Sequence, residues 1–227
     1  MGVLIGLEGI DASGKTTISL LLEEKLISNG IKAKRVLKKN TDYLDKRIKD
    51  YTTTIKSLIW NDSNDPYHFV TSQGWLFKHA LWYSVLAENY IEPNLKEYDV
   101  LIVDGWFYKI YSRFLLKEDF NKELLNSVFK SIRRCDYVFM LDASPEICWK
   151  RRENFRYTEM GGYDFEVKDP FKSFVDYQSK VREQLKGIGK KEYWNIIPTD
   201  KLTVNETVDL LFSAIQNLFV AVKSNEG

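Results

Sequence analysis

Short apolar runs alternate along the chain with segments of helical periodicity. The runs cover residues 3–7, 31–37, 99–104, 137–142 and 193–198. Apolar runs of this length, bounded by polar residues, are typical of buried strands. Apolar residues at helical spacing predict helices over residues 17–28, 67–95, 122–134, 170–185 and 207–222, and the mixed segment before Trp60 is also expected to be helical. The alternation predicts an α/β chain with a five-stranded parallel sheet flanked by helices.

The segment between the first run and the first helix fits a phosphate-binding loop. Residues 9–16 read G-I-D-A-S-G-K-T and match the P-loop pattern G-x-x-x-x-G-K-[ST], between a strand and a helix as the motif requires. Glycine lets the backbone turn N–H groups toward phosphate, and the helix N-terminus adds positive potential. Lys15 is expected to reach the β- and γ-phosphates, and Thr16 to bind Mg²⁺. The predicted nucleotide-binding residues are Gly9, Asp11, Ala12, Ser13, Gly14, Lys15, Thr16 and Thr17.

Charged residues follow the predicted strands at the edge where ligands of parallel sheets bind. Asp11, Lys38, Asp104 and Asp142 all stand at or just past such strand ends. Asp104 follows an apolar run as the magnesium-organising carboxylate of a P-loop enzyme does, so it is predicted to share the metal with Thr16. Asp142 has the same placement, with a structural role in a turn as the equal alternative.

Three arginines, Arg151, Arg152 and Arg156, lie just beyond the run that ends at Asp142, in a stretch that also contains Gly161-Gly162. Arginines in a flap that closes over the site stabilise the charge of a transferring phosphoryl group. We therefore expect a mobile lid at about residues 151–165, with a solvated basic surface as the alternative. Aromatic residues gather between positions 75 and 111, where they could stack a planar base or simply fill the core.

The composition limits the classes of protein that remain. Hydrophobic residues make up 44% and charged residues 29% of the 227 positions, which suits one globular domain spanning residues 1–227. A net charge of +1 predicts no nucleic-acid partner. Two cysteines form neither a disulfide framework nor a zinc cluster. Neither a signal peptide nor a long apolar span is recognisable, so we expect a cytoplasmic protein without membrane contact.

Taken together, these segments resemble the thymidylate kinase family. The resemblance covers nearly the whole chain and is carried by residues 7–17, 91–95, 141–146 and 171–185, together with the strand ending at Asp104. It implies a P-loop kinase with Mg-ATP as donor and a nucleoside monophosphate, most of all TMP, as acceptor. It also implies that Asp11 lies near the acceptor sugar, that the transition-state arginine comes from the lid because Ala12 is not arginine, and that the chain forms a homodimer.

The acceptor half departs from the family pattern. The family follows its strand-end aspartate with Arg-Tyr, whereas Gly105-Trp106 follows Asp104 here. The family also carries an arginine on the long helix, where Trp82 or Tyr83 stands, and lysines occupy positions 38 and 39. An anionic acceptor needs cations, and Lys38, Lys39, Lys78, Lys109 and Arg113 are the candidates.

We therefore predict a cytoplasmic ATP-dependent kinase with Lys15, Arg152, Arg156 and Asp104 as catalytic residues and Asp11, Lys38, Trp82, Tyr83 and Arg113 around the acceptor. The alternative is a kinase of the same fold that phosphorylates a hydroxyl of a deoxynucleoside or other small metabolite. Asp104 or Glu8 would then serve as the base. A nucleotide-dependent switch is a third interpretation, which the lid arginines disfavour.

Overall fold

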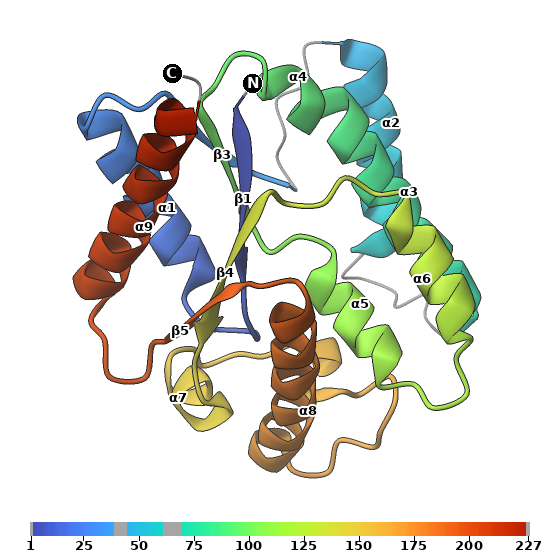
Figure 1. Ribbon diagram of the computed structural model, residues 1–227. Coiled ribbons are helices and arrows are strands. Elements are labelled where there is room, and N and C mark those ends of the chain that lie inside the picture. Colours follow the sequence, from blue (N-terminus) through green and yellow to red (C-terminus); the bar gives the residue numbers. More distant parts are fainter. Residues whose placement is uncertain (1, 39–44, 61–69, 226–227) are drawn as a thin grey trace.

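The computed structural model describes residues 2–38, 45–60 and 70–225. Its centre is a sheet of β1 (Val3–Glu8), β2 (Ala33–Val36), β3 (Val100–Asp104), β4 (Tyr137–Asp142) and β5 (Asn195–Pro198). The strand order is β2-β3-β1-β4-β5 and every neighbouring pair is parallel (Figure 1). The predicted fold class is thus confirmed. Because the strands are parallel, the carboxyl ends of β1, β3 and β4 meet at one edge.

Helices cover both faces of the sheet and bury its apolar side chains (Figure 1). On one face, α1 (Lys15–Ser28) and α9 (Val204–Asn225) pack against β1 through Ile18, Leu22 and Leu211. The other face is covered by α2 (Lys46–Ile59), α3 (Ser72–Leu86), α5 (Tyr108–Leu115), α6 (Lys122–Lys130) and α8 (Pro170–Lys191). This second face carries most of the aromatic residues.

The predicted long helix is confirmed where the structure describes it. α3 continues through a π-helical turn at Ala87–Ile91 into α4 (Glu92–Asn94), which ends just before β3. Residues 61–66, where the sequence predicts a break, and Lys39, a candidate cation, lie outside the described residues.

Two helices differ most from the sequence-based prediction, and α6 also ends at Lys130 rather than at the predicted Arg134. α5 was not predicted, because its eight residues give only about two turns in which a helical period can be recognised. α8 was predicted to end at Leu185, before Gly187 and Gly189, but it runs on to Lys191. Gly189 packs closely against Trp194, since an added Cβ would lie 3.2 Å from the Trp194 ring. Tertiary packing there overrides the low helix propensity of glycine.

α7 (Pro145–Lys150) begins with proline at its first position, as predicted. Ser144 stands at its N-cap, but its hydroxyl makes no capping hydrogen bond. The Ser144 N–H instead donates to Asp200 Oδ1 at 2.8 Å. Within the described ranges, no helix combines the length and apolarity needed to cross a bilayer.

Candidate active site

The phosphate-binding loop turns tightly between β1 and α1. Gly9 has φ 146° and Gly14 has φ 98°, both in the region that favours glycine. A Cβ at Gly9 would lie 2.7 Å from the carbonyl oxygen of Leu141, so the approach of β4 also requires glycine there. Gly14 is the N-cap of α1. The first-turn N–H groups of a helix have no intrahelical acceptors, which makes this end of α1 suitable for an anion.

Lys15 lies within this loop. Its Nζ donates to the carbonyl oxygens of Gly9 and Ile10, at 2.9 and 2.6 Å, and to Ser13 Oγ at 3.1 Å. Burial, and then the charge of Lys109, lower the pKa of Lys15 from its ordinary value. A desolvated ammonium at this position interacts strongly with any anion that enters the loop.

Thr16 and Asp104 bring hard oxygen atoms together beside the loop. Thr16 Oγ1 donates to Asp104 Oδ2 at 2.5 Å, and Asp104 pairs with Leu7 across β3 and β1. Hydroxyl and carboxylate oxygens are ligands that Mg²⁺ prefers, so this donor set fits the ion. No group of three His, Cys, Asp or Glu side chains that could hold a metal occurs in the described residues. A magnesium ion here would take its other ligands from water and phosphate, as it usually does.

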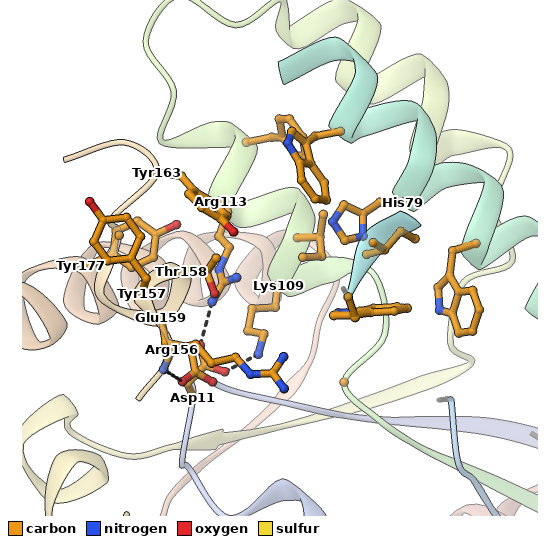
Figure 2. Close-up of a pocket in the computed structure, with 18 of the residues that line it drawn as sticks. Asp11, His79, Lys109, Arg113, Arg156, Tyr157, Thr158, Glu159, Tyr163 and Tyr177 are labelled. Atoms are coloured by element: carbon orange, nitrogen blue, oxygen red, sulfur yellow. Dashed lines mark hydrogen bonds and ion pairs between the residues drawn. The ribbon is translucent and has the colours of Figure 1, made fainter. Parts of the chain in front are cut away.

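A cluster of charges surrounds Asp11. Lys109 Nζ lies 2.6 Å from its Oδ1 and Arg113 Nη2 lies 2.7 Å from its Oδ2, both reaching from α5 (Figure 2). Gln178 of α8 donates from Nε2 to Oδ2 at 3.1 Å. Burial would raise the pKa of Asp11, but Lys109 and Arg113 hold it well below its usual range. Asp11 is therefore an ionised carboxylate fixed between two cations.

Lys38 supplies a further cation just after β2. Its Nζ donates to the carbonyl oxygen of Gly105, in the turn that follows β3. Burial lowers the pKa of Lys38 to about 8, while Asp104 and Glu8 act in the opposite direction. The structure thus places Lys38 next to the position where the sequence lacks the arginine of the family pattern.

Glu8, the other candidate for a general base, is enclosed by the protein. It is fully buried, and its Oε1 accepts the N–H of Trp106 at 2.6 Å. Burial raises the pKa of Glu8. A carboxylate enclosed in this way is poorly placed to deprotonate a hydroxyl acceptor, which weakens that part of the alternative interpretation.

Two clefts open beside the loop. The aromatic cleft, of about 680 Å³, is lined by the rings of Trp60, Trp75, His79, Trp82, Tyr83, Trp106, Tyr157, Tyr163 and Tyr177. The loop cleft, of about 660 Å³, is lined by residues 11–18 with Leu141, Arg151, Thr199, Leu202, Val204 and Thr207. Both clefts are lined by Asp11, Lys15, Asp104, Lys109 and Arg152. They therefore meet at the phosphate-binding loop.

His79 is a polar side chain among these rings (Figure 2). It is 8% exposed, and its Nδ1 is buried without a hydrogen-bond partner. The His79 ring centroid lies 5.9 Å from that of Trp75 and 6.4 Å from that of Tyr83. Burial, followed by the charges of Arg113 and Lys78, lowers the pKa of His79 to about 3. The imidazole is therefore neutral. In the sequence, a lone histidine among apolar helix residues does not indicate that its side chain lines a cleft.

The residues predicted to surround the acceptor all line the aromatic cleft: Asp11, Lys38, Trp82, Tyr83 and Arg113. Lys78 does not line it. Its Nζ lies 5.1 Å from the Trp75 ring centroid and donates to the carbonyl oxygen of Leu58. Phe107 and Tyr108 are core residues, which supports the packing interpretation for this part of the aromatic run.

The predicted lid arginines lie in different places. Arg151 Nη1 donates to the carbonyl oxygen of Ala12 at 3.5 Å and lines the loop cleft. Arg152 pairs with Glu159 and lines both clefts, and Arg156 lines the aromatic cleft. Arg151, which the predicted catalytic pair left out, thus contacts the phosphate-binding loop directly.

Asp142 was interpreted either as a site carboxylate like Asp104 or as a structural residue, and its contacts support the structural role. Arg182 of α8 holds its carboxylate with Nε at 2.5 Å and Nη2 at 2.9 Å, and Lys186 Nζ lies 3.1 Å away. The carboxylate therefore anchors α8 to the end of β4.

The model of the thymidylate kinase family matches residues 7–210. The chain belongs to the thymidylate kinase family. It is an ATP-dependent kinase, as the sequence predicts. It is 28% identical to the probable thymidylate kinase 1 of Saccharolobus solfataricus, covering 96% of this chain and all (100%) of that one. It is 26% identical to the thymidylate kinase of Clostridium novyi, covering 95% and 97%.

A solved thymidylate kinase, from Candida albicans, has a similar fold. Its TM-score is 0.66 at 20% identity, and the match covers 95% of this chain and 92% of that one. The family membership and these relatives favour a nucleoside monophosphate over the hydroxyl acceptor of the alternative interpretation.

Proposed function

We propose that this kinase transfers the γ-phosphoryl group of ATP to the phosphate of TMP. The observation that carries the proposal is that the two clefts meet at Lys15 and Asp104. Donor phosphates in the loop cleft and an acceptor phosphate in the aromatic cleft would face each other there. Alignment of this kind is the main protein contribution to phosphoryl transfer. The relatives named as thymidylate kinases point to TMP as the acceptor.

The loop cleft is assigned to ATP. The amino end of α1 and the Lys15 ammonium bind its phosphate oxygens, and Arg151 lies beside them. Thr16 and Asp104 would hold Mg²⁺, which when bound neutralises charge on the β- and γ-phosphates.

The aromatic cleft is assigned to TMP. Lys38 stands in for the missing family arginine, because a Cβ on Gly105 would lie 3.4 Å from Lys38 Nζ. Lys38, Lys109 and Arg113 together supply the positive charge that a phosphate needs in a partly buried site. The aromatic rings around His79 provide faces for the base.

Transfer needs no general base in this arrangement, since the attacking phosphate oxygen of TMP is already anionic. Lys15, with Arg152 and Arg156 from the lid, stabilises the charge on the transferring group. Arg151 joins them from the loop cleft. Asp11, held by Lys109 and Arg113, faces the acceptor.

The test is an acceptor comparison with Mg-ATP, in which ADP release and product mass are measured together. TMP, dUMP and thymidine are compared side by side, with Lys15→Ala as the matched inactive variant. We expect TMP to give TDP. Turnover of thymidine without turnover of TMP would instead establish a hydroxyl acceptor, and ADP release that no acceptor stimulates would indicate a switch.

A further inference from the structure

Gln178 is a fully buried polar side chain in the middle of α8. Its Nε2 donates to Asp11 Oδ2 at 3.1 Å and to the carbonyl oxygen of Glu159 at 2.7 Å. Its Oε1 accepts the Asp11 N–H at 3.2 Å. These partners fix the orientation of the amide, because a reversed amide would set its NH₂ group against the Asp11 N–H. One side chain thus joins the phosphate-binding loop to the lid.

Glu159 passes this connection on to the lid arginines. It belongs to a 3₁₀ turn at Tyr157–Met160, and its Oε2 accepts the Arg156 N–H at 2.8 Å. The same carboxylate pairs with Arg152. The position of Glu159 therefore determines where the backbone of Arg156 and the guanidinium group of Arg152 are held.

The contacts form a continuous path from Asp11 through Gln178 and Glu159 to Arg152 and Arg156. A second lid contact, the ion pair between Lys117 and Asp164, reaches the segment just after α5 and does not involve Asp11. Gln178 therefore links Asp11 to the lid through direct hydrogen bonds to both.

We infer that Gln178 is a positioning residue that couples acceptor binding to the placement of the lid arginines. The inference rests on the proposed function, in which Asp11 faces TMP and the lid arginines face the transferred group. TMP bound against Asp11 strengthens the placement of the Gln178 amide that is hydrogen-bonded to it, and through that amide the placement of Glu159. Because such coupling is reciprocal, TMP tightens the binding of ATP and ATP tightens the binding of TMP. The lid arginines are then in place when both substrates are present.

The test measures the affinity of a non-hydrolysable ATP analogue with Mg²⁺, with and without TMP, by calorimetry. In the wild-type enzyme we expect TMP to tighten analogue binding by at least about fivefold, the lower end of typical coupling. Gln178→Met keeps the length of the side chain but removes its hydrogen bonds. It should bind each ligand alone and bring the ratio of affinities close to one. Gln184→Met, on the same helix outside both clefts, is the matched control and should keep the wild-type ratio.

Hydrogen exchange at the Tyr157–Met160 turn gives a second readout. TMP should slow exchange there in the wild-type enzyme and in Gln184→Met, and leave it unchanged in Gln178→Met. Gln178→Asn, whose shorter side chain cannot span the same partners, replaces the methionine variant if that variant does not fold. A merely structural role of Gln178 would lower the affinity for the ATP analogue equally with and without TMP, and the ratio of the two affinities would stay at the wild-type value. A Gln178 variant that keeps the wild-type ratio therefore overturns the inference.

The two proposals fail in different ways. A wild-type enzyme that converts TMP to TDP without any coupling between the ligands contradicts the role of Gln178 alone. A wild-type enzyme that binds the ATP analogue but, when supplied with Mg-ATP, does not convert TMP to TDP contradicts the proposed function.

Discussion

Arg113 Nη2 lies 2.7 Å from Asp11 Oδ2, and the two side chains are 18% and 9% exposed. Lys109, one turn earlier on α5, binds the other oxygen of the same carboxylate at 2.6 Å. Two cations therefore share one anion, and the cluster keeps a net positive charge that suits a phosphate in the aromatic cleft. Arg113 thereby supplies positive charge in a site that lacks the two arginines of the family pattern, one at position 82 or 83 and one at position 105.

Arg113→Met should raise the KM for TMP by about 10- to 100-fold, the cost of a lost hydrogen bond to a charged group. The KM for ATP should stay within about twofold, because Arg113 does not line the loop cleft. Steady-state kinetics with each substrate varied in turn measures both constants. Lys78→Met removes a lysine outside the cleft and serves as control. An unchanged KM for TMP in the Arg113 variant would contradict the assignment of the acceptor phosphate.

Lys15→Ala should lower kcat by at least about 10³-fold, as expected for a group that stabilises the transferring phosphoryl charge. The fold should persist, since Lys15 contributes a buried charge and no apolar packing. Single-turnover kinetics measures the chemical step, and circular dichroism checks the fold. Turnover near the wild-type level in a folded variant would refute the kinase mechanism.

Thr16→Val should abolish activity at ordinary Mg²⁺ concentrations, whereas Thr16→Ser should keep most of it. Valine removes the hydroxyl that lies beside Asp104, while serine retains an oxygen in the same place. A titration of activity against free Mg²⁺ separates the two variants, and chelation with EDTA should silence the wild-type enzyme reversibly. Equal magnesium dependence in the valine and serine variants would remove Thr16 from the metal site.

His79 should make the folded state sensitive to acid. Its pKa falls from the ordinary 6.5 to about 3, so below pH 6.5 the unfolded chain binds a proton that the folded chain does not. The stability contributed by neutral His79 is therefore complete above pH 6.5 and is lost as the pH falls toward 3. Between pH 7 and pH 5 this loss amounts to about 2 kcal/mol.

His79→Phe should remove that part of the acid sensitivity, and urea unfolding at the two pH values measures it. A phenylalanine variant that loses as much stability at pH 5 as the wild-type protein would show that His79 is not the group responsible.

Features that a contiguous motif or a strand end carries could be predicted from the sequence, whereas side-chain contacts between distant segments with no such pattern could not. The phosphate-binding loop is contiguous, and each strand carries its own apolar run, so Lys15, Thr16 and Asp104 were predicted in their places. Gln178 meets Asp11 across 167 positions of sequence, and nothing near either residue signals the contact. α5 escaped prediction, although Lys109 and Arg113, four positions apart, would share a face of a helix.

The two clefts meet at shared residues but are built from different kinds of segment. Residues 11–18 form one continuous part of the loop cleft, whereas the aromatic cleft draws most of its side chains from separate helices and the lid. A change on α3 alters the wall of the aromatic cleft and leaves every residue that lines the loop cleft unchanged, whereas α5 also holds Asp11 of the phosphate-binding loop. Substrate preference in such an architecture can diverge by single substitutions while the energy source stays the same, so new acceptors are accessible to evolution or design through α3 alone.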